Sequence, residues 1–125
     1  MEIQPNNAAA WNNRGISLRK LNHYQDSMDS YDKALKIDPN NAAYWSNRGN
    51  VLRDLKRYKE SISSFDKALQ IQPDYADAWN NRGYSLEILG CYEEALKNYD
   101  KTIELDPNQK CAPDNRKQVL KKLDK

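Results

Sequence analysis

The sequence has few of the residues from which catalytic and metal sites are built. Its only histidine, His23, falls where a turn is expected, and its two cysteines do not have the spacing of a zinc site. The phosphate-binding patterns G-x-x-x-x-G-K and G-x-G-x-x-G do not occur. We therefore expect no enzyme activity, no bound metal ion and no cofactor.

The cysteines are also too few for a disulfide framework. Cys91 and Cys111 are expected near opposite ends of one helix, roughly 20 Å apart at the rise of 1.5 Å per residue. A disulfide cannot span that distance. We expect two independent thiols, as in a reducing compartment.

Long apolar runs and a large net charge are missing as well. No stretch is long enough to cross a membrane, and the start, MEIQPNN, lacks the basic and then apolar pattern of a secretory leader. The formal net charge is +2, which gives no case for nucleic acid or membrane binding. Because no targeting signal is seen, we expect by default a cytoplasmic protein.

What the sequence does contain is one motif at a fixed spacing. WNNRG at 11–15 returns as WSNRG at 45–49 and as WNNRG at 79–83, a spacing of 34 residues. Other residues with this spacing are Pro5, Pro39, Pro73 and Pro107; Leu18, Leu52, Leu86 and Leu120; Tyr24, Tyr58 and Tyr92; and Tyr31, Phe65 and Tyr99. Such a period is typical of a repeat protein, in which each unit packs only on its neighbours.

Each unit is predicted to contain two helices. In the first unit they span about Ala8 to Leu21 and about Tyr24 to Ile37. The second helix has apolar residues at helical spacing, as at Met28, Tyr31 and Leu35. It ends before DPN or QPD, because proline cannot continue a helix and disfavours helix at the residue before it.

The repeated pattern resembles the tetratricopeptide repeat family. At the positions of the family pattern, the first unit has Trp11, Arg14, Gly15, Leu18, Ser27, Tyr31, Ala34 and Pro39. The resemblance implies an all-α, right-handed superhelical solenoid of three 34-residue helix-turn-helix repeats, at 8–41, 42–75 and 76–109. The chain departs from the family in three ways. Arg replaces the usual Leu before each Gly, Leu replaces the usual Tyr three places after each Gly, and Ser27 and Ser61 replace the usual Ala.

The two ends fit the same frame. Residues 1–7 match the end of a second helix, so we interpret them as the remnant of a preceding repeat. Residues 110–125 match a first helix and are predicted to form a capping helix, with Pro113 at the place of Trp and Leu120 facing inward. Repeat arrays need such a polar-faced end.

Helix geometry divides the recurring residues of the first helices between two sides. At 100° per residue, Trp11, Gly15 and Leu18 share one side, and Asn13 and Ile16 lie on the opposite side. The first side is predicted to pack against the second helix, with Gly allowing a close approach. The opposite side is therefore the one left for function.

In the resembled family this opposite side lines a concave groove that receives peptides. The candidate peptide-binding residues are Asn12, Asn13, Ile16, Arg19, Lys20, Ser46, Asn47, Asn50, Arg53, Asn80, Asn81, Tyr84 and Asn115. An asparagine side chain offers both a donor and an acceptor. The row at 13, 47, 81 and 115 can therefore hold a peptide backbone as an asparagine ladder; alternatively, these are only tolerated polar residues on a helix.

The carboxylate clamp, by which some co-chaperones of the family hold a C-terminal carboxylate, is not expected here. Carried over to this sequence, its lysine places hold Asn12 and Asp77, and its arginine place holds Asn81. An aspartate would repel a carboxylate. Of the two asparagine places, Asn47 fits and Ile16 does not.

The recurring arginines fall away from the groove side. Arg14, Arg48, Arg82 and Arg116 are predicted to have a structural role near the helix interface. Arginine is costly to bury unpaired, so some acceptor must exist. The candidate partners, which recur with the same period, are Asp32, Asp66 and Asp100.

Two functions remain open from the sequence. The first is a protein-interaction scaffold that binds an extended peptide or a partner helix through the asparagine ladder. The second is a structural or self-associating segment of a longer array, either a monomer or weakly associated through its exposed N-terminal repeat.

Overall fold

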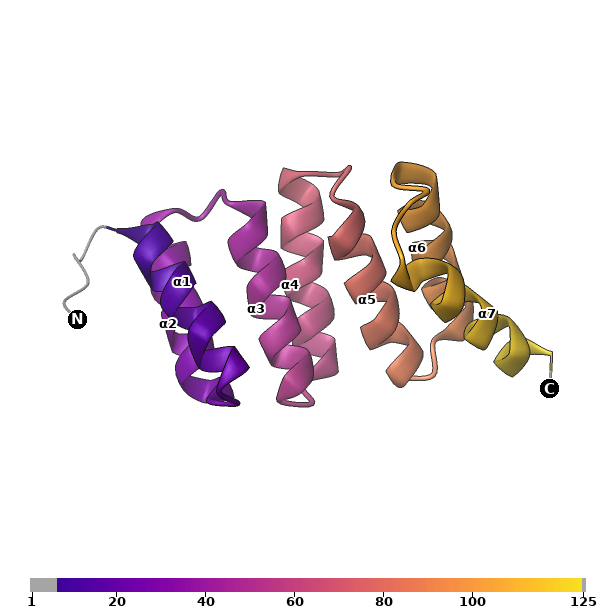
Figure 1. Ribbon diagram of the computed structural model, residues 1–125, viewed down its shortest axis with the longest axis horizontal. Coiled ribbons are helices and arrows are strands. Elements are labelled where there is room, and N and C mark those ends of the chain that lie inside the picture. The colour runs from indigo at the N-terminus through magenta and orange to yellow at the C-terminus, as the bar shows by residue number, and fades with distance from the viewer. Residues whose placement is uncertain (1–6, 125) are drawn as a thin grey trace.

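The computed structural model describes residues 7–124, which form seven α-helices and contain no strand (Figure 1). The helices are α1 (Ala8–Lys20), α2 (Tyr24–Ile37), α3 (Ala42–Asp54), α4 (Tyr58–Ile71), α5 (Ala76–Ile88), α6 (Tyr92–Leu105) and α7 (Cys111–Leu123). They stack side by side along the long axis as three helix pairs followed by one further helix. The predicted all-α solenoid is confirmed. The proposed repeat remnant at 1–7 lies, apart from residue 7, outside the described residues.

The helix ends follow from local hydrogen bonds. The Asn7 and Asn41 side chains accept hydrogen bonds from the amides of Ala10 and Ala43, each at 3.0 Å, and so cap α1 and α3. The first helix ends at Lys20, one residue before the predicted Leu21. It ends there because the following residues turn back on the helix: Asn22 has φ of 64°, and the His23 amide donates to the Leu18 carbonyl at 2.9 Å.

Within each pair, a glycine lets the two helices approach closely. A Cβ added to Gly15 would lie 2.6 Å from Cε1 of Tyr31, and one added to Gly49 would lie 2.8 Å from the same atom of Phe65. The serines that depart from the family pattern lie at these contacts. Ser27 donates a hydrogen bond to the Gly15 carbonyl at 2.6 Å, and Ser61 donates to that of Gly49 at 2.8 Å. The predicted close approach at glycine is therefore present in the structure.

The core continues from one pair to the next. Met28 and Tyr31 of α2 pack against Val51 and Leu52 of α3. At the end of the array, Leu86, Ala95, Tyr99 and Val119 form the corresponding cluster, so α7 covers the third pair. The capping helix was predicted to bury Leu120, but Leu120 is only half-buried and Val119 is fully buried. The reason is that α7 has no second helix to cover Leu120, whereas Val119 faces the pair before it.

Two of the tryptophans join their helix pair to the segment before it. The indole N–H groups of Trp45 and Trp79 donate to the carbonyls of Pro39 and Pro73, each at 2.8 Å. The three tryptophans are partly buried and pack against the core. These bonds explain why Trp and Pro recur together in the sequence.

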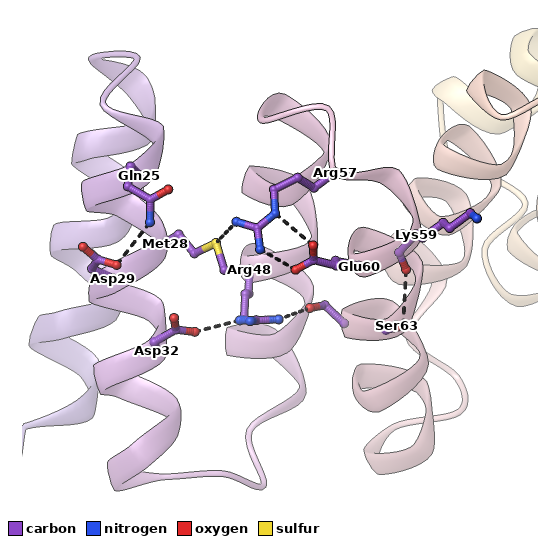
Figure 2. Close-up of polar contacts among 10 residues, drawn as sticks. Gln25, Met28, Asp29, Asp32, Arg48, Arg57, Lys59, Glu60 and Ser63 are labelled. Carbon is purple, nitrogen blue, oxygen red and sulfur yellow. Dashed lines mark hydrogen bonds and ion pairs between the residues drawn. The ribbon is translucent and has the colours of Figure 1, made fainter.

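Three of the four recurring arginines bind the candidate aspartates, and these bonds connect neighbouring pairs. Nε of Arg48 donates to Asp32 of α2 at 2.7 Å, and its Nη1 donates to Ser64 of α4 at 2.7 Å (Figure 2). Equivalent bonds join Arg82 to Asp66 at 2.8 Å and Arg116 to Asp100 at 2.5 Å. Each of these arginines therefore links the second helix of one pair to the first helix of the next.

The array curves toward its first helices. The backbone of α1 lies close to that of α3, α3 lies close to α5, and α5 lies close to α7, whereas the backbones of α2, α4 and α6 do not come as close to one another. The side lined by α1, α3, α5 and α7 is therefore the inner, concave surface. Within residues 7–124, none of the helices combines the length and the apolar character needed to cross a lipid bilayer.

Candidate functional site

The inner surface is built by contacts between residues 35 apart, one more than the sequence period. Nδ2 of Asn47 donates to Oδ1 of Asn12 at 2.9 Å, and Nδ2 of Asn115 donates to Oδ1 of Asn80 at 3.4 Å. Both bonds run between first helices of neighbouring pairs. Asn12 and Asn80 belong to one row of the inner surface, and Asn47 and Asn115 belong to the next row. Part of their hydrogen-bonding capacity is therefore used to join the helices.

The candidate residues Ser46, Asn80, Asn13 and Asn81 differ in how much of their surface is accessible to a partner. Ser46 and Asn80 have exposed fractions of only 2% and 6%, so they lie mainly within the helix stack. Asn13 is exposed and Asn81 is half-buried, and neither side chain forms a hydrogen bond with another described residue. The row at 13, 47, 81 and 115 thus keeps donors and acceptors that the fold does not use.

A second row on the inner surface consists of ion pairs at the same spacing of 35. Nε of Arg19 lies 2.5 Å from Oδ2 of Asp54, and Nζ of Lys122 lies 3.2 Å from Oε2 of Glu87. Glu87 is buried and also accepts a hydrogen bond from the Tyr99 hydroxyl at 2.8 Å. Burial, and then the Glu87 carboxylate, raise the pKa of Tyr99 above its ordinary value.

A hollow of about 420 Å³ opens between the first two pairs. Its lining combines amides, charged groups and ring systems: Ile16, Arg19, Lys20, Asn22, Tyr24, Tyr31, Asn47, Asn50 and Asp54. Five of these residues are candidates from the sequence: Ile16, Arg19, Lys20, Asn47 and Asn50. The structure therefore brings part of the predicted site together around one depression.

The remaining candidates lie further along the inner surface. The Arg53 guanidinium carbon lies 4.9 Å from the ring centre of Tyr84, whose side chain is exposed. Nη1 of Arg53 and Oδ1 of Asn50 are both buried and have no hydrogen-bond partner among the described residues. Burial of the guanidinium lowers the pKa of Arg53, although Asp54 acts in the opposite direction.

Sequence reasoning missed several residues of this surface. It did not identify Asp54 and Lys122 as ion-pair partners, or Tyr24 and Tyr31 as part of the hollow. A search for complementary residues 35 apart, rather than 34, could have found both ion pairs. The hollow could not be found in this way because it includes a second helix and a turn.

The inner surface has no features of a metal centre. Three or more His, Cys, Asp or Glu side chains do not gather anywhere in the described part of the chain in a way that could hold an ion. Cys91 and Cys111 are free and exposed. The arrangement can offer hydrogen bonds, charge and aromatic contact, which suits binding.

Family models of tetratricopeptide repeats match several segments of the chain. A model described as "Tetratricopeptide repeat" matches residues 8–41 and 76–109, which together exceed half of the chain. A model described as "TPR repeat" matches residues 49–90, and a further tetratricopeptide repeat model matches residues 30–63. The comparison with curated proteins gave no significant match.

Solved structures of the same fold cover nearly the whole chain. The first TPR of Spaghetti (RPAP3), bound to the HSP90 peptide SRMEEVD, is 26% identical, with 100% of this chain and 99% of that chain covered and a TM-score of 0.93. The first TPR domain of human RPAP3 is 28% identical, with 96% and 94% covered and a TM-score of 0.92. The Sgt2 TPR domain from Aspergillus fumigatus, at 23% identity, 94% and 79% coverage and a TM-score of 0.90, shares the fold.

The family matches and the helix-pair architecture agree. The matched segments 8–41 and 76–109 each contain one complete pair, α1 with α2 and α5 with α6. The Trp, Gly and aromatic residues that carried the resemblance form the contacts within and between the pairs. The chain belongs to the tetratricopeptide repeat family.

Proposed function

We propose that this protein is a protein-interaction scaffold that binds an extended peptide or a partner helix on its inner surface. The observation that carries the proposal is the row of asparagines at 13, 47, 81 and 115. These side chains lie on four successive first helices and retain unused donors and acceptors. A peptide backbone presents acceptors and donors along its length, so such a row can hold it whatever its sequence.

The relatives support a peptide ligand. The first TPR of Spaghetti (RPAP3), at 26% identity, was solved with an HSP90 peptide. In this chain the clamp places hold Asn12, Ile16, Asn47, Asp77 and Asn81, so none of the three cation places carries a cation. We therefore propose the asparagine row, and not a carboxylate clamp, as the means of binding.

The test is a selection from a library of random dodecapeptides displayed on phage, followed by titration of the selected peptides. The variant replaces Asn13, Asn47 and Asn81 by Ala. A matched control replaces Gln25 and Gln70, which are exposed on α2 and α4, by Ala. Equal helicity of all three proteins is checked by circular dichroism.

We expect the wild type and the control to bind the selected peptides alike. The affinity of the asparagine variant should be at least about tenfold weaker, because each of the three lost hydrogen bonds contributes about 0.5–1.5 kcal/mol. Equal binding by the asparagine variant would remove the ladder from the proposal. The absence of any selected peptide would overturn peptide binding altogether.

The alternative function, a structural or self-associating segment, has one observation in its favour. Arg14 bonds Ser30 but has no aspartate partner within residues 7–124, unlike Arg48, Arg82 and Arg116. A second chain could supply one. Sedimentation equilibrium distinguishes the two functions, since a concentration-dependent dimer without peptide binding supports the alternative.

A further inference from the structure

Arg53 lies in the row of the inner surface where charged residues pair with the residue 35 positions later. At the equivalent place in the first pair, Arg19 binds Asp54, and in the third pair Glu87 binds Lys122. The residue opposite Arg53 by this rule is Ile88, which has no charge. Arg53 therefore lacks the partner that the fold provides to the charged residues on either side of it.

The surroundings of Arg53 do not supply another partner. Its guanidinium forms no hydrogen bond or ion pair with any residue in 7–124, and its Nη1 is buried. The nearest acid in sequence, Asp54, is held by Arg19. Burial of a charge without an acceptor is costly, and buried donors in folded proteins almost always have a partner. This arginine therefore points to a ligand.

Beside Arg53, which is a donor without an acceptor, lies an acceptor without a donor. Oδ1 of Asn50, one helical turn earlier in α3, is a buried acceptor without a donor. Tyr84 of α5 places its ring 4.9 Å from the guanidinium carbon of Arg53 and leaves part of its own side chain exposed. Together the three side chains offer one cationic donor group, one acceptor and one aromatic face.

We propose that Arg53, Tyr84 and Asn50 form a binding site for the side-chain carboxylate of an acidic residue in a bound peptide. This inference rests on the proposed function, since it specifies the chemistry of the same partner. The carboxylate binds the planar guanidinium, whose N–H groups match its two oxygens. Tyr84 stacks against the guanidinium and holds it in place. Rotation of the Asn50 side chain brings its buried Oδ1 to a main-chain N–H of the same peptide.

This site differs from a clamp for the end of a chain. It lies between α3 and α5, and its Arg53 and Tyr84 are not at clamp places. The carboxylate that it binds comes from a side chain. The bound residue is therefore an internal Asp or Glu, and the peptide continues in both directions along the row of asparagines. A C-terminal amide on the peptide should leave binding unchanged.

The experiment uses the full chain and the dodecapeptide phage library, fused to the phage through the peptide C-terminus, so that no clone has a free terminal carboxylate. Selections are run on the wild type and on Arg53→Met. The control is Arg48→Met, because Arg48 also lies on α3 but is paired with Asp32 away from the inner surface. Selected peptides are then synthesised with their Asp or Glu and with Asn or Gln in its place.

We expect an acidic residue at one position of the peptides selected by the wild type and by Arg48→Met. The acidic peptides should bind these two proteins about 10- to 100-fold more tightly than their amide versions, the range of a hydrogen bond to a charged group. Arg53→Met should bind both versions equally. Should Arg53→Met not fold, Arg53→Lys keeps the charge without the planar donors, and should show a smaller preference.

Two outcomes separate this inference from the proposed function. Peptides selected without an acidic position, or an acidic preference that Arg53→Met retains, would overturn the carboxylate site and leave peptide binding intact. If neither selection yields a peptide, the proposed function fails and this inference fails with it.

Discussion

Nε of Arg48 lies 2.7 Å from Oδ1 of Asp32, across the boundary between the first two helix pairs. The same guanidinium bonds Ser64 in its own pair and lies 5.9 Å from the ring centre of Trp45. Because each pair of a repeat array contacts only its neighbours, such bridges contribute to the coupling between pairs. The arginine that replaces the usual family residue is therefore part of the connection between units.

Arg48→Ala should lower the free energy of unfolding by about 1 kcal/mol, since the ion pair is partly exposed and such pairs contribute little. Asp32→Ala should lower the free energy of unfolding by less than Arg48→Ala does. The double variant should lower it by less than the sum of the two single losses. Urea unfolding measures all three. Lys101→Ala, which removes a surface pair within α6, serves as the control with almost no effect. Strict additivity of Arg48→Ala and Asp32→Ala would contradict the bridge.

Gly49→Ala should destabilise the protein although alanine is the better helix former. The added Cβ would lie 2.8 Å from the ring of Phe65, which is fully buried and has no room to move. Overpacking costs about 1–3 kcal/mol, against about 1 kcal/mol gained from helix propensity. Thermal unfolding gives the net change. The cost should shrink when Phe65→Leu makes room; a cost that persists there would argue against the steric cause.

Lys56→Gly should stabilise the protein by about 0.5–1 kcal/mol. Lys56 has φ of 63°, a left-handed conformation that costs a side-chain-bearing residue about 1 kcal/mol, and Gly90 occupies the equivalent place in the third pair. Chemical denaturation checks the sign. The matched control is Lys67→Gly, an exposed change within α4, which should cost about 1 kcal/mol. A loss of stability in Lys56→Gly would refute the explanation.

Stability should fall as the pH rises above about 10, the ordinary pKa of tyrosine. Burial and the neighbouring Glu87 raise the pKa of Tyr99 in the folded chain, so the folded state keeps a proton that the unfolded chain loses. The stabilisation is complete below that pH and is lost above it.

Tyr99→Phe should flatten this alkaline loss in urea unfolding between about pH 8 and 11, the range around the ordinary pKa. Phenylalanine fits there, because Phe65 fills the same place in the second pair. At neutral pH the variant should be less stable by about 1 kcal/mol, since Glu87 loses a hydrogen bond. Equal pH dependence in the two proteins would show that Tyr99 is not responsible.

The helices were predictable because the period and the prolines mark them. The predicted second helix, Tyr24 to Ile37, agrees with α2 in both bounds. The error at Leu120 arose because the repeat pattern assumes a second helix that α7 does not have. Its neighbour Val119 corresponds to Val51, a fully buried position that faces the preceding pair. Where neighbours differ, the same repeat position is buried to a different degree.

The sequence could predict the candidate site only one helix at a time, and not the contacts between helices. Direction around a helix placed Asn12 and Asn13 on one side, but it could not show that Asn12 is used by Asn47. It also placed Arg53 on the inner surface without showing that its partner is missing. Both facts depend on which residues of two helices meet, and that register is set by the packing of whole pairs.

The pairing of residues 35 apart in neighbouring first helices also fixes the order in which the units can follow one another. If the second and third units exchanged places, Glu87 would lie opposite Asp54, and Arg53 would lie opposite Lys122. Both contacts would then be between like charges and therefore repulsive. The units look interchangeable by their period, yet their charges specify a sequence of neighbours. Recombination that shuffled whole units of this gene would therefore conserve the fold of each unit and damage the joints between them.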